Sequence, residues 1–254
     1  MMRKSLLLQF IGGCMLVGLW EGLTRGLHVP EFIFPRFSTL LMEFGRFPGF
    51  FLKGMLTTLL ESCAGLFLGG LAAYLLAVVF SFSKLLKYLF YHWFVALKTV
   101  PIIAISPMIV IWVGSGMLSK VLMASIITFF PILVNTLQGF YNITDNQRNL
   151  FKSFNATFWQ TFLRLRIPMS MGYFFTGLKI ASPLSTIGAI VAEFSGANEG
   201  LGYIILKSSW ESNTRSLMVA VLLASVMGIA LYKFIELGEY VVTKFVPHVT
   251  TTQI

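Results

Sequence analysis

Charged side chains are scarce in this sequence. Asp, Glu, Lys and Arg make up 11% of its 254 residues, whereas soluble proteins carry about 25%. A soluble fold cannot cover its surface with so few charges, and 56% hydrophobic residues are too many for a disordered chain. The composition therefore excludes a soluble enzyme and indicates a protein that lies in a lipid bilayer.

Cysteine and histidine are also rare. Cys14 and Cys63 are too few for a disulfide framework or a cysteine-based zinc site. His28, His92 and His248 lie far apart, without the spacing of metal ligands. No Ser/His/Asp or Cys/His arrangement has a supporting context either, so the sequence predicts no catalytic residue and no metal site.

A nucleotide-binding loop is missing as well. Residues 114–120, GSGMLSK, lack the Gly before Lys and the Ser or Thr after Lys that a phosphate loop needs. They also follow an apolar run rather than a predicted strand. We therefore expect this chain to bind no cofactor itself.

Basic residues outnumber acidic ones by 19 to 10. They are scattered among apolar runs and form no basic stripe, so we expect no nucleic-acid partner. Anionic lipid headgroups and a positive cytoplasmic side explain the excess better.

Long apolar runs dominate what is present. A helix that crosses a bilayer needs about 20 mostly apolar residues, and its backbone groups must pair within the segment. The runs are too long and too uniformly apolar for the strands of a membrane barrel. We expect an all-α, polytopic membrane protein with six transmembrane helices in a single domain, 1–254. The six runs are 5–21, 55–80, 85–113, 119–141, 172–192 and 215–236.

Three longer connections join these runs. Segments 22–54 and 193–214 fall on one side of the membrane, and loop 142–171, between the fourth and fifth runs, falls on the other. With the N-terminus inside, nine Lys and Arg residues lie on the inner side and seven on the outer side. Arg3 and Lys4 beside the first run favour the same orientation. Both termini and loop 142–171 are therefore expected in the cytoplasm.

Residues 145–168 of that loop, DNQRNLFKSFNATFWQTFLRLRIP, predict two short helices. Asp145 is expected to cap the first helix. Asn155 is expected to end it in the left-handed conformation, for which Asn is second only to Gly. The second helix is expected over about 157–166, with Pro168 marking the change into the next run.

The first of these helices carries both basic and apolar side chains. Arg148 and Lys152 are four residues apart and share a face. Leu150, Phe151 and Phe154 supply an apolar face. A short amphipathic helix outside the bilayer needs a surface to pack on, which is either the membrane interface or a cytosolic partner.

The loop resembles the cytoplasmic EAA loop of ABC importer permeases. In that family it reads Glu-Ala-Ala, three residues, Gly, and later a hydrophobic–Pro pair. Here the Glu position is Asn149, the Ala positions are Leu150 and Phe151, the Gly position is Asn155, and the final pair ends at Pro168.

Other blocks support the same resemblance. Residues 99–139 are similar to the third and fourth spans of the nitrate/sulfonate/taurine-type permease group, and residues 177–202 to its fifth span and following loop. Residues 29–41, VPEFIFPRFSTLL, also resemble its first outer segment. The likeness covers nearly the whole chain, in the family's order.

The resemblance implies a permease subunit of an ATP-driven importer in the inner membrane. Two copies pair, two ABC ATPase subunits use the ATP, and an extracytoplasmic solute-binding protein delivers a sulfonate, a nitrate-like anion or a vitamin precursor. The loop helix enters a groove of the ATPase, and no catalysis is expected on this chain. The residues expected at that contact are Arg148, Asn149, Leu150, Phe151, Lys152, Phe154, Asn155, Ala156 and Pro168.

The resemblance also assigns Glu193, Gly200 and Gly202 to the outer rim that meets the binding protein. The alternative is a carboxylate that anchors the loop, with glycines that form its turns.

Residues inside the apolar runs suggest a pathway. Pro101 and Pro107 interrupt one run, which indicates unwound backbone along a solute path or a tolerated kink. Lys98 is a charge inside an apolar run, and such charges are usually functional or paired.

Four other residues in the runs have simpler interpretations. Pro131 and Pro183 are expected to be tolerated kinks. Lys179 is expected to extend to the inner interface, and Glu61 to lie at the outer one.

Two other classes of function compete with the importer. A secondary transporter or channel that works without ATP should show repeated halves and more charge within its spans. A membrane-embedded enzyme should show clustered His, Asp or Glu there. The sequence shows neither feature.

Overall fold

A computed structural model describes residues 2–97 and 99–245, and every regular element in this part of the chain is helical. The expected all-α class is therefore confirmed. The elements in chain order are α1 (Met2–Gly26), α2 (Phe37–Arg46), α3 (Pro48–Phe82), α4 (Lys84–Leu97), α5 (Ile102–Val113), α6 (Met117–Tyr141), α7 (Asp145–Ser153), α8 (Phe158–Thr161), the π-helical turn η1 (Phe162–Arg166), α9 (Ile167–Glu193), α10 (Leu201–Trp210) and α11 (Thr214–Phe245).

Four helical stretches among the described residues are long and apolar enough to cross a membrane by length and composition. They are α3, α6, the continuous run Phe158–Glu193, and α11 over Thr214–Lys244. They coincide with the predicted runs 55–80, 119–141, 172–192 and 215–236. The 25 residues of α1 contain the predicted run 5–21.

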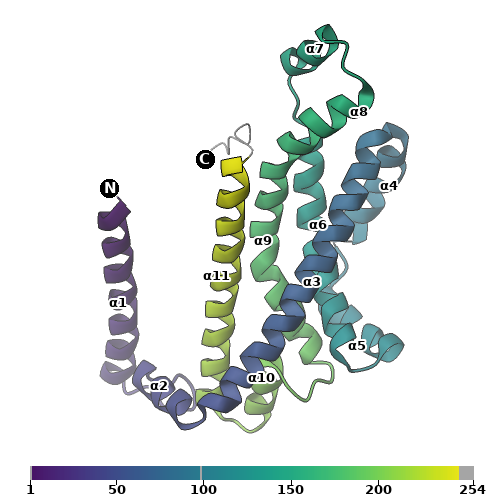
Figure 1. The fold of residues 1–254 in the computed structure, drawn as a ribbon. Coiled ribbons are helices and arrows are strands. Elements are labelled where there is room, and N and C mark those ends of the chain that lie inside the picture. Colours follow the sequence, from purple (N-terminus) through teal and green to yellow (C-terminus); the bar gives the residue numbers. More distant parts are fainter. Residues whose placement is uncertain (1, 98, 246–254) are drawn as a thin grey trace.

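The expected third span is not one helix. Run 85–113 is divided into α4 and α5, and Pro101 immediately precedes α5. Proline lacks an amide hydrogen and disfavours helical backbone in the residue before it. Pro101 itself is extended, with φ of −62° and ψ of 112°. With 12 residues α5 is only about 18 Å long, too short to cross a bilayer alone. In Figure 1, α4 lies beside the end of the bundle that carries α7, and α5 lies beside the opposite end.

Helices α3, α6 and α9 pack closely along one another and form the centre of the bundle, with α11 against α9. Small residues allow the close approach. A Cβ atom added at Gly188 of α9 would lie 2.7 Å from the Cα of Ala124 in α6. Small-residue contacts of this kind are typical of helix pairs in membranes.

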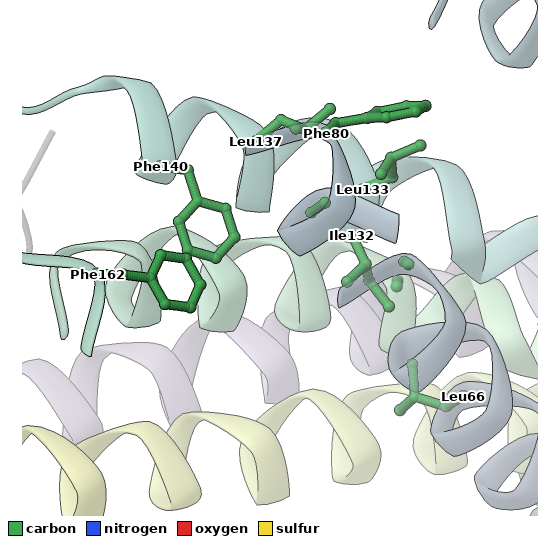
Figure 2. Packing of buried hydrophobic residues seen from close by; sticks show 10 residues of the cluster. Leu66, Phe80, Ile132, Leu133, Leu137, Phe140 and Phe162 are labelled. Carbon is green, nitrogen blue, oxygen red and sulfur yellow. The ribbon is translucent and has the colours of Figure 1, made fainter. Parts of the chain in front are cut away.

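A cluster of buried apolar side chains fills the bundle towards the α7 end, and Figure 2 shows its packing. Its labelled members come from α3, α6 and η1. The Phe162 ring, at the start of η1, stacks on that of Phe140 with centroids 6.0 Å apart. The loop after α6 is therefore anchored directly in the core. The labelled residues are Leu66, Phe80, Ile132, Leu133, Leu137, Phe140 and Phe162.

Figure 1 shows three parts at one end of the molecule: the start of α1, the end of α11 and the helix α7. At the opposite end, Trp20 of α1 donates a hydrogen bond to the Pro35 carbonyl (3.1 Å). Glu21 accepts one from the Ser38 hydroxyl (2.8 Å). These bonds attach α1 to α2 at the end that also carries α10.

Candidate functional site

We call residues 144–168 the coupling segment. Its first helix, α7, begins with a capping box. The Thr144 hydroxyl accepts a hydrogen bond from the backbone amide of Gln147 (3.3 Å), and the Gln147 side-chain oxygen accepts one from the backbone amide of Thr144 (3.1 Å). The prediction that Asp145 caps this helix is wrong by one residue, because the cap is Thr144 and Asp145 is the first helical residue. A Thr with Gln three residues later satisfies two amides at once, which a single Asp does not.

Asn155 ends this unit as predicted, with φ of 49°. The Asn155 amide donates to the Lys152 carbonyl (2.9 Å), and the Ala156 amide donates to the Phe151 carbonyl (3.0 Å). These two bonds form a Schellman motif, which requires the left-handed residue. The turn after α7 therefore has a fixed geometry.

The second helix begins with another capping box, between Thr157 and Gln160. It does not end at Pro168. The chain stays helical from Phe158 to Glu193, and the Ile167 amide donates to the Phe162 carbonyl, five residues back, in a π turn. The wider turn just before Pro168 lets the helix continue past a residue that has no amide hydrogen.

Aromatic contacts attach the coupling segment to the end of α3. The Phe82 ring packs against Phe162, Phe158 and Trp159, with centroids 4.6, 5.6 and 5.9 Å away. The Arg166 guanidinium also donates to the Ser81 carbonyl (3.2 Å). The coupling segment therefore contacts α3 directly and, through Phe162, contacts α6.

The residues expected to contact an ATPase lie on the outside of this unit. No residue of α7 is buried. Leu150 is 54% exposed and Phe154 is 77% exposed, so an apolar face is open at the tip. Phe151, Ala156 and Pro168 are half-buried, and the remaining predicted contacts are exposed: Arg148, Asn149, Lys152 and Asn155.

A cavity of about 1140 Å³ opens between α3, α4, α5, α6 and α9. Its lining is almost entirely apolar, and Ser125 and Asn135 are polar members. Pro131, inside α6, lies in this lining, and the Asn135 side-chain amide donates to the Pro131 carbonyl (2.8 Å).

The predicted pathway residues relate to this cavity indirectly. Within the described residues the lining includes Val100 and Ile105, but neither Pro101 nor Pro107. Pro101 lies at the break between α4 and α5, and its neighbours Val100 and Ile102 line the cavity, whereas Pro107 lies inside α5. Lys98 lies outside the described residues.

The expected outer-rim residues Glu193, Gly200 and Gly202 are all buried, which corrects their placement on the surface. The Glu193 carboxylate accepts the Thr58 hydroxyl (2.6 Å) and the Gly202 amide, and the Thr58 oxygen accepts the Leu201 amide (2.8 Å). Glu193 therefore links the N-terminus of α10 to Thr58 of α3.

Two further expectations about charged residues are wrong. Glu61 is not interfacial but 4% exposed, beside Glu193 and near Lys120 of α6, which is 3% exposed. Lys179 does not extend to the interface but forms an ion pair of 2.7 Å with Glu239 of α11. The sequence does show that these charges lie in apolar runs, which is a signal that they are buried or paired. It does not show which of the charges face one another.

Comparison with known proteins now decides the family. A family model for the inner membrane component of binding-protein-dependent transport systems matches residues 65–244, which include the whole coupling segment. The chain belongs to this family. It is the transmembrane permease of an ABC importer, a multi-pass protein of the inner membrane and a transport component rather than a catalytic subunit.

Several known permeases are similar to this one over most of their length. The formylaminopyrimidine transport permease protein ThiX of Halalkalibacterium halodurans is 33% identical over 215 residues, 85% of this permease and 86% of the relative. A probable ABC transporter permease protein of Haemophilus influenzae is 30% identical over 222 residues, 87% and 91% of the two chains. The putative aliphatic sulfonates transport permease protein SsuC of Bacillus subtilis is 22% identical over 238 residues, 93% and 85% of the two chains.

Proposed function

We propose that this permease pairs with a second copy, receives ABC ATPase subunits on its α7 tips, and transports a small solute delivered by an extracytoplasmic binding protein. In this arrangement both chain termini and the coupling segment lie in the cytoplasm. The observation that supports it best is the coupling segment itself: capped at its start, fixed at its turn by Asn155, and packed against α3 and α6 at its base.

The contacts give the proposal a force path. ATP-driven closure of the ATPase pair displaces the exposed face of Leu150 and Phe154. The Schellman turn at Asn155 transmits the displacement to α8, because its two backbone hydrogen bonds resist bending. Phe82 and Phe162 then pass it to α3 and α6, which border the cavity. Switching between two arrangements of packed helices is the usual basis of such gating.

The ATPase must be another chain in this proposal, because the segment 114–120 lacks the phosphate-loop residues. Pro101 lies at the break between α4 and α5, and Pro107 lies inside α5, so we assign both to the pathway as shaping residues. Lys98, three residues before Pro101 in the sequence, is assigned to the pathway as well. The surface near Glu199, which pairs with Lys53 at 2.6 Å, replaces the buried Glu193 as the rim that meets the binding protein.

The cavity also bears on the solute class. Its lining carries the aromatic rings of Phe94, Phe129 and Phe130, and polar groups are few. Such a wall suits an organic solute with a ring or an alkyl chain better than a strongly hydrated inorganic anion. Among the classes handled by the relatives, we therefore favour a vitamin precursor or an alkyl sulfonate over nitrate.

Site-specific photo-cross-linking tests the proposal. A photoreactive residue at Leu150 of the assembled complex is expected to capture the ATPase subunit, whereas the same residue at Phe67, which is 67% exposed on α3, is not. Mass spectrometry of the solute that copurifies with the complex tests the solute class. Absence of any ATPase adduct from Leu150 and Phe154 would refute the docking.

A further inference from the structure

A buried charge cluster at the α10 end of the bundle is not used by the force path described above. Glu61 from α3 and Glu193 from α9 are 4% and 1% exposed. Thr58 and Glu61 are three residues apart on one face of α3, and the Thr58 hydroxyl donates to Glu193 (2.6 Å), so the two carboxyl groups are neighbours. Lys120 from α6 is 3% exposed and adds one positive charge nearby. Two ionised carboxylates cannot lie side by side in such a buried place without a large energetic cost.

The hydrogen bonds favour one of the two carboxyl groups as the ionised one. Both oxygens of Glu193 accept a hydrogen bond, Oε1 from the Thr58 hydroxyl and Oε2 from the Gly202 amide. The group also lies at the N-terminus of the ten-residue helix α10, where the helix dipole stabilises a negative charge. Every available donor therefore favours an ionised Glu193.

Glu61 is placed in the opposite way. Its Oε2 is buried, and no donor among the described residues reaches it. Lys120 supplies none to this oxygen, and its ammonium donates to the Ser115 carbonyl. A carboxyl oxygen without a donor, beside an ionised carboxylate, is satisfied when it carries a proton and donates it to its neighbour.

The charges of the cluster then balance. Lys120 and Glu193 are the charged groups that face Glu61 in the described structure, and α10 adds only backbone amides. One positive charge, one negative charge and one neutral carboxyl group give a net charge of zero. We propose that Glu61 and Glu193 form a proton-binding site, in which one proton, carried by Glu61, joins α3 to the end of α9.

The site has a structural consequence at the outer loop. Loss of the proton adds a second buried negative charge, and its repulsion from Glu193 acts on the group that anchors α10. We therefore expect alkaline conditions to loosen α10 and residues 194–200 from α3. This inference does not depend on the docking of an ATPase to α7.

Infrared difference spectroscopy of the assembled complex in lipid nanodiscs tests the proposal. At neutral pH the wild type is expected to show the carbonyl stretch of a protonated carboxylic acid, and Glu61→Gln is expected to lose it. Glu43→Gln and Glu239→Gln, at the other two buried glutamates of the described chain, are the matched controls and should keep it. An absent band in the wild type, or a band unchanged in Glu61→Gln, overturns the proposal.

Thermal unfolding gives a second, independent reading. Gln can donate a hydrogen bond to Glu193 without a titrating proton, so the midpoint of Glu61→Gln should not change between about pH 6 and pH 9, whereas that of the wild type should fall. A parallel fall in both proteins overturns the proposal. If Glu61→Gln does not assemble, the two control variants decide. A band lost in either one assigns the proton elsewhere and refutes the site, whereas a band kept in both leaves Glu61 and Glu193 as the buried glutamates of the described chain that can carry it and supports the site.

Discussion

Gly200 is the residue at which the backbone and the neighbouring side chains are most restrictive. Its φ is +115°, and an added Cβ would overlap the Glu193 carboxylate. We expect Gly200→Ala to lower the free energy of unfolding by about 2 kcal/mol or more, because it combines backbone strain with displacement of the group that anchors α10. Thermal unfolding of the purified permease in detergent measures the loss.

Gly196→Ala is the matched control for that change. Gly196 also has a positive φ, +134°, but its nearest neighbour for an added Cβ is the Ser115 side chain at 3.7 Å, an ordinary contact. Gly196→Ala should therefore lose only the unfolding free energy that the strained backbone accounts for. Equal losses in the two variants would mean that the packing of Gly200 on Glu193 contributes nothing.

The ion pair between Lys179 and Glu239 supports a second prediction at this scale. Its two side chains are 20% and 9% exposed, so removal of one leaves the other charge largely buried. We expect Lys179→Met to destabilise the bundle by about 3 kcal/mol, and Lys179→Met with Glu239→Gln to regain most of that loss.

An exposed ion pair within α11, the helix that carries Glu239, provides the comparison. Lys233 and Glu236 are 65% and 46% exposed, and Lys233→Met should change the unfolding free energy by less than about 1 kcal/mol. The burial argument for Lys179 would be wrong if its single and double variants were equally stable.

These residues also show what the sequence can reveal at the scale of single side chains. The left-handed Asn155 was predictable because the turn depends on a few adjacent residues. The partner of Lys179 lies 60 residues away, and Glu61 meets residues from two other helices. Apolar runs establish that a charge is in the membrane, but they do not show which neighbouring helix it faces.

At the scale of elements, one ring makes the aromatic contacts between the end of α3 and the coupling segment. Phe82 contacts three aromatic side chains of α8 and η1. We expect Phe82→Ala to leave the complex assembled but to lower substrate-stimulated ATPase activity by a factor on the order of ten, because force transfer to α3 is weakened.

Phe67→Ala provides the control for this variant, because it removes the same ring from an exposed position of the same helix. It should retain wild-type activity. Normal substrate stimulation in Phe82→Ala would show that the aromatic contacts do not carry the coupling.

Two prolines explain why element boundaries were only partly predictable. Pro101 separates α4 from α5, whereas the helix continues past Pro168. The difference is the π turn at η1, which changes the hydrogen bonding just before Pro168. Whether the surroundings accommodate such a turn depends on packing, here of Phe162 in the core, and the local sequence does not reveal it.

At the scale of the whole molecule, the arrangement of ends makes a prediction about topology. The tip of α7 lies at the same end as the start of α1 and the end of α11, and α10 lies at the other end (Figure 1). In a background without the exposed Cys14 and Cys63, Leu150→Cys should react with a membrane-impermeant thiol reagent only from the cytoplasmic side. Trp210→Cys, at the end of α10, should react only from the outside.

Labelling of both positions from the same side would contradict the arrangement. Labelling of each from the side opposite to that expected would keep the arrangement but invert its orientation in the membrane.

The central claim is that the coupling segment is a stiff connection between a separate ATPase and the membrane helices. The most direct test is substrate-stimulated ATPase activity and solute uptake of the reconstituted complex with Asn155→Gly and Asn155→Val. Gly adopts the positive φ of this position freely, whereas a β-branched residue resists it. We predict that Asn155→Gly retains both activities and that Asn155→Val loses them while the complex stays assembled. Full activity in Asn155→Val would contradict the account.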